Sequence, residues 1–241
     1  MRVLDCSLPS PARNLALDEA LLNSVERNAA PDTLRFWESA APFVVIGTAQ
    51  ALHEEVYEDR CRTDGIAILR RCSAGGCVLQ GPGCLNFALA LRTESRPEIA
   101  SLHPSYDFIL GAIIRAFARR GIHLETAGIS DLVLHGRKVS GNAQRRRRRA
   151  ILHHGTLLYR ADTARMDRFL KEPLARPAYR GRRTHAQFVT ALPLPPATLH
   201  AAVCEAFGAA PAFEEPLPSE MDECRELACS KYESTAWTYR R

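Results

Sequence analysis

The sequence contains no long hydrophobic run. No apolar stretch approaches the ~18 residues that a membrane-spanning helix requires, and residues 1–9 lack the apolar core of a secretory signal peptide. We therefore expect a cytoplasmic protein with no membrane partner. The chain has 241 residues, of which 46% are hydrophobic and 24% charged, a composition typical of a globular protein. This length is enough for a sizeable core, and we expect one domain spanning residues 1–241.

Cysteine pairs of the Cys-x-x-Cys type are also absent. None of the eight cysteines forms such a pair, and Cys72, Cys77 and Cys84 lie in one glycine-rich segment. This distribution favours reduced thiols in a cytosolic protein over a disulfide framework. A zinc site built from these three thiols and a histidine is a less favoured alternative. We therefore expect no metal bound by protein side chains.

Lysine is scarce. The net charge is +5, yet only three of the 32 basic residues are lysines, namely Lys138, Lys171 and Lys231. Lys138 lies in a glycine-containing turn that is a candidate ligand loop. An ammonium is a compact point charge, so it fits between two anionic oxygens where a planar guanidinium would not. The alternative is an ordinary lysine in a surface turn.

Residues 145–149 are five consecutive arginines. Such a run could bind nucleic acid, but interleaved aromatic residues, helix-turn-helix spacing and a second basic patch of similar density are missing. We therefore expect no nucleic-acid partner. Self-repulsion among five like charges predicts a mobile loop that closes over a phosphate-bearing ligand.

Local patterns predict helices and strands in alternation. A helix is expected at residues 16–25, capped by Asn14, with a hairpin of residues 33–37 and 43–46 after it. Residues 54–63 and 104–120 are predicted to be helices, the second one amphipathic. Further strands are expected at residues 132–134, 138–140 and 151–159. The rhythm of a Rossmann fold is missing, so we predict an α+β fold with a mixed β-sheet flanked by helices.

Two segments carry the functional signal. The first is Arg-Arg-Cys-Ser-Ala-Gly-Gly at residues 70–76, which lies between strand-like runs at 65–69 and 85–91. Small residues let backbone N–H groups approach a ligand, and paired arginines supply positive charge, so the segment predicts an anion cradle. A tight hairpin with solvated arginines is the alternative. The second segment is Gly-Arg-Lys-Val-Ser-Gly-Asn-Ala-Gln-Arg at residues 136–145, followed by His-His-Gly-Thr-Leu-Leu at 153–158.

Together these motifs resemble the lipoate–protein ligase A and octanoyltransferase family, within the biotin/lipoate protein ligase superfamily. Residues 14–22, 34–37, 44–50 and 231–237 also resemble family elements, so the likeness runs from about residue 12 to the end. There are departures: Ala74 replaces a glycine, and Gln80-Gly81 replaces a His-Asp pair. The resemblance implies the catalytic-domain fold of this superfamily without a C-terminal accessory domain. It therefore implies either a separate accessory subunit or an altered adenylation step.

The resemblance implies attachment of lipoate or octanoate to a lysine of an acceptor protein, using ATP and Mg²⁺. The acceptor would be the lipoyl domain of a dehydrogenase complex or a protein like the H protein of glycine cleavage. Lys138 would be catalytic, because its ammonium can stabilise charge that grows on the acyl and phosphate oxygens. The residues implied to bind the nucleotide and acyl group are Arg70, Arg71, Ser73, Gly75, Gly76, Cys77, Val78, Leu79, Asn86, Asp131 and Lys138.

The position of cysteines bears on the route of activation. Transferases of the superfamily pass the acyl group through an enzyme cysteine, but no cysteine lies between Cys84 and Cys204, and His123 stands at the other known nucleophile position. The sequence therefore favours an ATP-dependent ligase. The alternatives are an octanoyl-carrier-protein-dependent transferase and a non-catalytic lipoyl-binding module.

Overall fold

Two β-sheets form the framework of the protein in the computed structural model, which describes residues 1–94, 96–173, 176–210 and 212–241. The larger sheet has the strand order β11-β1-β2-β6-β10-β9-β8-β7, and the smaller has the order β4-β3-β5. The strands are β1 (Arg2–Asp5), β2 (Thr33–Trp37), β3 (Phe43–Ile46), β4 (Ala67–Arg70), β5 (Val78–Gln80), β6 (Cys84–Arg92), β7 (Glu125–Ala127), β8 (Asp131–Leu134), β9 (Arg137–Arg146), β10 (Ala150–Leu158) and β11 (Phe213–Glu214).

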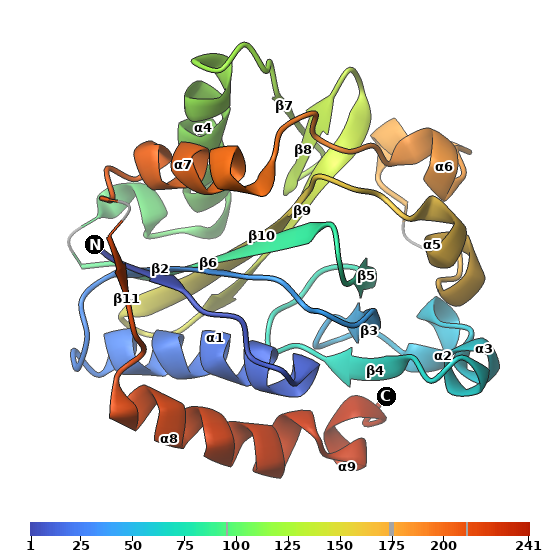
Figure 1. The fold of residues 1–241 in the computed structure, drawn as a ribbon, viewed down its shortest axis with the longest axis horizontal. Helices are drawn as coiled ribbons and strands as arrows, with labels where there is room; N and C mark the ends of the chain where they lie inside the picture. The colour runs from blue at the N-terminus through green and yellow to red at the C-terminus, as the bar shows by residue number, and fades with distance from the viewer. Residues whose placement is uncertain (95, 174–175, 211) are drawn as a thin grey trace.

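Helices cover both faces of the larger sheet. In Figure 1, α1 and α8 lie below it and α4 and α7 lie above it, while α2, α3, α5 and α6 gather at the end where the smaller sheet lies. The helices are α1 (Pro11–Glu26), α2 (Leu52–Glu55), α3 (Glu58–Thr63), η1 (Pro97–Ile99), α4 (Leu102–Ala118), α5 (Thr163–Phe169), η2 (Ala178–Arg180), α6 (His185–Phe188), α7 (Pro196–Ala206), α8 (Pro218–Leu227), η3 (Ala228–Tyr232) and α9 (Thr235–Thr238).

The larger sheet mixes parallel and antiparallel pairs. Strands β11, β1 and β2 are parallel, whereas β2, β6, β10, β9, β8 and β7 pair antiparallel in that order. The predicted α+β fold with a mixed sheet flanked by helices is therefore confirmed. The register of the two nine-residue strands at the centre places Asn86 opposite Thr156, and this pair later forms part of the site.

The predicted hairpin of residues 33–46 is wrong. Strand β2 pairs with β1 and β6 in the larger sheet, while β3 pairs with β4 and β5 in the smaller one. Every residue of both strands is buried, so each is an interior strand with a partner on either side. The turn between them therefore leads from one sheet to the other.

Two helix boundaries also differ from the prediction. Helix α1 begins at Pro11, because the Ser10 hydroxyl accepts a hydrogen bond from the Arg13 backbone and caps the first turn. Asn14 thus lies inside the helix. The helix predicted at residues 54–63 is two short helices, since Val56 is buried, extended and bridged to Leu170.

The amphipathic helix predicted at residues 104–120 is confirmed as α4, Leu102–Ala118. Its buried face presents Tyr106, Ile109, Ile113 and Phe117 at helical spacing to a core cluster that includes the sheet residues Phe36 and Phe87. This packing covers one face of the sheet over its central strands. The opposite face is covered by α1, whose apolar residues join a second core cluster.

The five arginines at residues 145–149 do not form the expected mobile loop. Arg145 and Arg146 belong to β9 and pair with β10, so only residues 147–149 make the turn. The guanidinium of Arg146 donates to the carbonyls of residues 99 and 100, and the Arg149 backbone donates to the Glu26 carboxylate. Strand pairing and these contacts hold the run as a tight hairpin.

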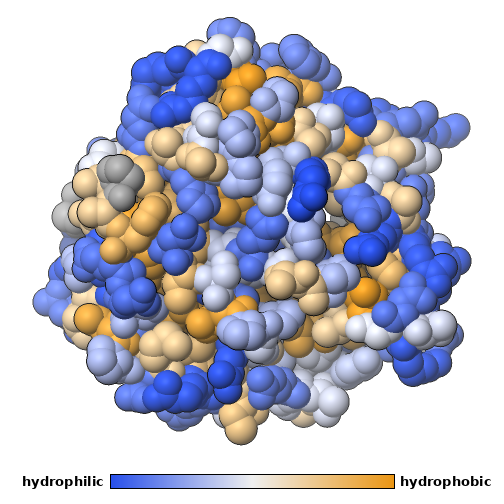
Figure 2. All heavy atoms as spheres, viewed as in Figure 1, coloured by the Kyte–Doolittle hydropathy of each residue, from blue (hydrophilic) through white to orange (hydrophobic). Residues whose placement is uncertain are grey.

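The surface is mixed in character. Figure 2 shows hydrophilic and hydrophobic residues interspersed over the face seen in Figure 1. Among the described residues, no helix combines the length and the apolar character that crossing a membrane requires.

Candidate active site

Two neighbouring cavities lie where the two sheets meet. The first, of about 130 Å³, is lined by residues of α1, β2, β3, β9 and β10 and by the glycine-rich turn of residues 73–76. Its wall includes these residues expected from the sequence: Arg71, Gly75, Gly76, Cys77, Val78, Asn86, Asp131 and Lys138. The two functional motifs, far apart in the chain, therefore converge on one cavity.

The second cavity, of about 110 Å³, adjoins the first and shares Cys77, Val78, Gln80, Lys138, Gly141 and Thr156 with it. Its remaining wall is mostly apolar and includes Leu79, Leu158, Leu170 and Phe188, with Arg180 and His185 as basic members. Leu79, expected as a contact, thus lines the second cavity and not the first. Lys138 lies between the two cavities.

A carboxylate holds the Lys138 ammonium. The Nζ atom of Lys138 lies 2.8 Å from Asp131 Oδ1, and the other oxygen of Asp131 accepts a hydrogen bond of 2.6 Å from the Tyr179 hydroxyl. The lysine side chain passes over Gly141, where a Cβ atom would be only 2.9 Å from Nζ. The glycine of the Lys-Val-Ser-Gly motif therefore leaves room for the ammonium to lie against the strand. Tyr179 was not foreseen from the sequence, because no local motif marks it.

Arg71 encloses the glycine-rich turn. One guanidinium nitrogen donates to the carbonyls of Ala74 and Gly76, at 2.7 and 2.9 Å, and Nε donates to the Ser73 hydroxyl at 3.0 Å. Gly75 has a φ of +94°, which L-residues with side chains rarely adopt. Gly75 and Gly76 are at least partly exposed to the cavity. The turn thus presents backbone to a ligand while Arg71 fixes its shape.

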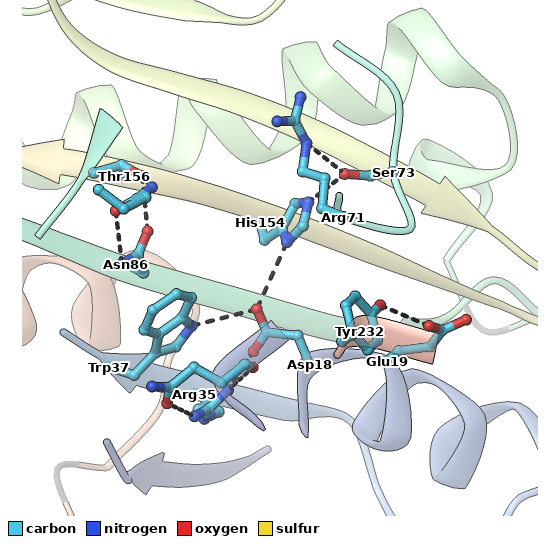
Figure 3. Close-up of polar contacts among 12 residues, drawn as sticks. Asp18, Glu19, Arg35, Trp37, Arg71, Ser73, Asn86, His154, Thr156 and Tyr232 are labelled. Carbon is cyan, nitrogen blue, oxygen red and sulfur yellow. Dashed lines mark hydrogen bonds and ion pairs between the residues drawn. The ribbon is translucent and has the colours of Figure 1, made fainter. Parts of the chain in front are cut away.

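A chain of polar contacts runs from Arg71 to helix α1 (Figure 3). The Ser73 hydroxyl lies 2.6 Å from His154 Nε2, and His154 Nδ1 lies 3.6 Å from Asp18 Oδ2. Because the Ser73 hydroxyl accepts from Arg71 and still has a proton to donate, it can donate to Nε2, and a proton on Nδ1 would then face Asp18. Ser73 is fully buried, so this is a positioning chain and not a nucleophile open to substrate.

Asp18 is held from its other side. Its carboxylate pairs with Arg35 at 2.6 Å and accepts from the Trp37 indole at 3.3 Å, and all three side chains are buried. Sequence reasoning did not assign Asp18, Arg35 or His154 to the site. The available signal was a pair of polar residues, Asn14 and Asp18, that lie four positions apart on the buried face of a helix. Both bind the Arg35 guanidinium.

Arg70 does not contact either cavity. Its fully buried guanidinium donates to backbone carbonyls of residues 47, 50 and 238, at 2.7 to 2.9 Å. The sequence-based expectation that Arg70 holds phosphate is therefore corrected to a structural role. Two adjacent arginines on a strand end point in opposite directions, so only one of them can face the cavity.

Three neutral side chains, those of Gln80, Thr156 and Asn86, close into a ring of hydrogen bonds. Gln80 donates to the Thr156 hydroxyl at 2.7 Å, Thr156 donates to Asn86 at 2.8 Å, and Asn86 donates back to Gln80 at 3.1 Å. All three line the first cavity. This stretch of wall is thus polar but uncharged.

The three cysteines of the glycine-rich segment are poor nucleophiles. Burial raises the pKa of Cys72 to about 11 and that of Cys84 to about 12, and it raises the pKa of Cys77 well above its ordinary value. The thiolate is the reactive form of cysteine, so these thiols are largely unreactive near neutral pH. All eight cysteines are free.

The sequence matches the family model of the lipoyl protein ligase A/B catalytic domain over residues 10–208. The protein therefore belongs to this family, as the motifs predicted. Among solved structures it is similar to a bi-partite lipoate protein ligase of Thermoplasma acidophilum, described with its E2 lipoyl domain. The identity is 22% and the TM-score 0.84, and the match covers 99% of this chain and 95% of that one.

Two further solved structures share the fold. A lipoate-protein ligase A bound with ATP has 22% identity and a TM-score of 0.84, covering 99% of this chain and 98% of that one. LipL1 of P. falciparum in complex with lipoate has 16% identity and a TM-score of 0.77, covering 100% of this chain and 74% of that one.

Proposed function

We propose that this protein is an ATP-dependent lipoate–protein ligase, which activates lipoate or octanoate and transfers it to a lysine of an acceptor protein. The observation that carries the proposal is the place of Lys138, between two adjoining cavities and beside a turn of exposed backbone. Family membership supports it. So do the lipoate and ATP bound to proteins of the same fold.

The chemistry takes two steps. In the first, a carboxylate oxygen of the acid attacks the α-phosphorus of ATP, the bond to the β-phosphoryl oxygen breaks, and pyrophosphate leaves. In the second, the neutral amine of the acceptor lysine attacks the acyl carbonyl carbon, the bond to phosphate breaks, AMP leaves, and the amine proton passes to solvent. Negative charge grows on the oxygens around the reacting centre in both steps, and the Lys138 ammonium stabilises it there.

Each ligand is assigned a cavity. The first cavity has the apolar side chains of Leu15, Trp37 and Val45 in its wall and suits the acyl chain. The second cavity, with Arg180 and His185 among apolar residues, suits part of the nucleotide. The phosphates of the nucleotide would extend past Lys138 to the backbone of Gly75 and Gly76, which lines the first cavity. The fit is favourable because the turn exposes amide backbone without Cβ atoms and Lys138 is within reach of both cavities.

Mg²⁺ would enter with ATP. Among the described residues, no group of three histidine, cysteine or acidic side chains is arranged to hold a metal. Mg²⁺ is commonly bound through substrate phosphates and one or two carboxylates, with water completing its shell. Asp131, on the wall of the first cavity beside Lys138, is a carboxylate that could serve, and the ion would supply charge neutralisation of the phosphates.

The acceptor is proposed to be the lipoyl domain of a dehydrogenase complex or a related H-like protein. The relative from Thermoplasma acidophilum is described with its E2 lipoyl domain, and its bi-partite nature supports a separate accessory subunit here.

The eight free thiols suit the reducing cytoplasm.

A transferase that uses octanoyl carrier protein is the second candidate. It would require an activated cysteine, and the raised pKa values of Cys72, Cys77 and Cys84 argue against one near the cavity. The decisive experiment is to incubate the protein with a lipoyl domain, lipoate and ATP–Mg, then measure pyrophosphate and the mass of the acceptor. We expect both products, and we expect them to survive Cys→Ser changes at the three positions. Acylation that ignores ATP and requires octanoyl carrier protein would contradict the ligase.

A further inference from the structure

The C-terminal residues 235–241 pack against Arg70 and the loop of residues 47–50, although they lie beyond the part of the chain that matches the catalytic-domain family model, residues 10–208. Figure 1 places α9 and the C-terminus beside β4, the strand that leads into the glycine-rich turn. We call residues 235–241 the C-terminal brace. Its contacts are made with backbone atoms as well as with side chains, which makes them specific in position.

Arg70 joins the brace to the loop of residues 47–50. Its guanidinium donates to the Thr238 carbonyl at 2.7 Å on one side and to the carbonyls of Gly47 and Gln50 at 2.9 and 2.7 Å on the other. Among the described residues no carboxylate pairs with this buried cation, and desolvation lowers its pKa. The carbonyl oxygens alone satisfy it, so both segments must be in place around it.

The brace also contacts its neighbours directly. The Trp237 indole donates to the Arg70 carbonyl at 2.8 Å, and the Arg240 guanidinium stacks on the Trp237 ring, 3.9 Å from its centroid, while hydrogen-bonding to Thr48. The Leu52 backbone donates to the Arg241 carbonyl at 3.3 Å. These contacts hold the loop of residues 47–50 against the brace.

That loop supports the glycine-rich turn on its other side. The Thr48 backbone donates to the Ser73 carbonyl at 2.8 Å. Gly47 approaches the turn so closely that a Cβ atom there would lie 2.1 Å from the Gly75 carbonyl oxygen. The loop is therefore packed between the brace and the cavity wall, and a shift of the brace would be passed to Gly75.

We propose that the C-terminal brace is a positioning element for the glycine-rich turn and sets its fit to the nucleotide. This inference rests on the proposed function, which assigns the nucleotide to that turn. Loss of the brace should loosen Gly75 and Gly76 and impair ATP use. The acyl cavity is lined by α1, β2 and β10 as well, so lipoate use should change less.

Two variants of the full chain test the proposal. Arg240→Ala removes the stacking and the Thr48 contact at an exposed position, so the variant should fold. Trp237→Phe keeps an aromatic ring beneath Arg240 and removes the indole donor to the Arg70 carbonyl. Arg62→Ala is the control, because Arg62 is an exposed arginine whose ion pair is with Asp59 on α3.

Hydrogen exchange and steady-state kinetics of lipoate-dependent pyrophosphate release are then compared. In both brace variants we expect amide exchange of residues 72–77 to speed up at least about threefold. We expect KM for ATP to rise by about three- to tenfold while KM for lipoate stays within about twofold. The control should match the unchanged protein in both measurements.

The outcomes separate the two proposals. Unchanged amide exchange at residues 72–77 in both variants would overturn the proposed role of the brace. Equal increases in KM for ATP and for lipoate would overturn it as well. If the unchanged protein releases no pyrophosphate, the proposed ligase activity fails, and the exchange comparison still decides whether the brace positions the turn.

Discussion

Lys138 lies where the two cavities meet, so its ammonium can reach oxygens on both ligands. Replacing it with alanine should lower acyl transfer by about a hundredfold, or about 3 kcal/mol, because a donor aimed at growing charge is lost. Lys138→Arg should restore little, since a planar guanidinium is wider than an ammonium and distributes its charge differently. Single-turnover acylation of a lipoyl domain measures both effects. If the Lys138→Ala variant turned over as fast as the unchanged protein, Lys138 would have no catalytic role.

Asp18 and Arg35 form a buried ion pair at 2.6 Å on the floor of the site. Asp18→Asn should lower the free energy of unfolding by about 3–5 kcal/mol, because it leaves the Arg35 charge buried without its partner. The double change Asp18→Asn with Arg35→Met should recover part of that loss. Urea denaturation of the three proteins gives the comparison. A double variant no more stable than the single one would show that the charge of Arg35 is not the cause.

At the residue scale, the sequence identified the lysine and the turn but not the groups behind them. Local sequence motifs contain Lys138, Gly75 and Gly76, and the residue types in these motifs indicate their chemistry. Arg70 and Arg71 cannot be told apart by their residue type. Tertiary packing places Arg71 on the cavity wall and Arg70 among backbone carbonyls away from it. The chain from Ser73 through His154 to Asp18 joins three distant segments, so no local pattern could predict it.

At the scale of elements, the strands and helices were foreseen better than their partners. The residues of β2 and β3 were identified as strands, yet their pairing was wrong, because burial of a strand does not say which sheet it joins. The loop predicted at residues 145–149 was wrong for a different reason. Its charge argued for a loop, but acceptors on α1 and near η1 hold it in a hairpin.

The hairpin of residues 145–149 makes a prediction about proteolysis. Trypsin needs an extended, accessible segment, and this run is fixed by strand pairing and by hydrogen bonds to Glu26 and to the carbonyls of residues 99 and 100. We expect slow cleavage there that is the same, within about twofold, with and without ATP and lipoate. Mass spectrometry of early fragments locates the cuts. Cleavage that is rapid in the free protein and is suppressed by ligand would instead support a mobile loop that closes over the ligand.

At the scale of the whole molecule, one buried imidazole links stability to pH. Burial lowers the pKa of His153 to about 3, and its ring hydrogen-bonds to Gln144 and Asn142. The unfolded chain binds a proton on this group below its ordinary pKa of about 6.5, while the folded chain does not. Stability is therefore full above pH 6.5 and is lost as pH falls toward 3, by up to about 1.4 kcal/mol per pH unit.

The matching experiment is a series of denaturation curves between pH 7 and pH 4.5. His153→Gln should fold less stably at pH 7 but lose less stability on acidification. His103→Gln, a change at an exposed histidine, should keep the slope of the unchanged protein. If His153→Gln keeps that slope as well, His153 is not the titrating group.

Glu19 on α1 contacts two segments that lie far along the chain. Its carboxylate accepts from Lys231 and from the Tyr232 hydroxyl, both at 2.6 Å, and Arg147 lies 3.5 Å away. Strand β1 likewise takes its outer partner from residues 213–214. A ribosome makes α1 early and these partners late, so the emerging chain cannot bury Glu19 satisfactorily until residue 232 has appeared. We therefore expect the protein to finish folding only after most of it has been synthesised.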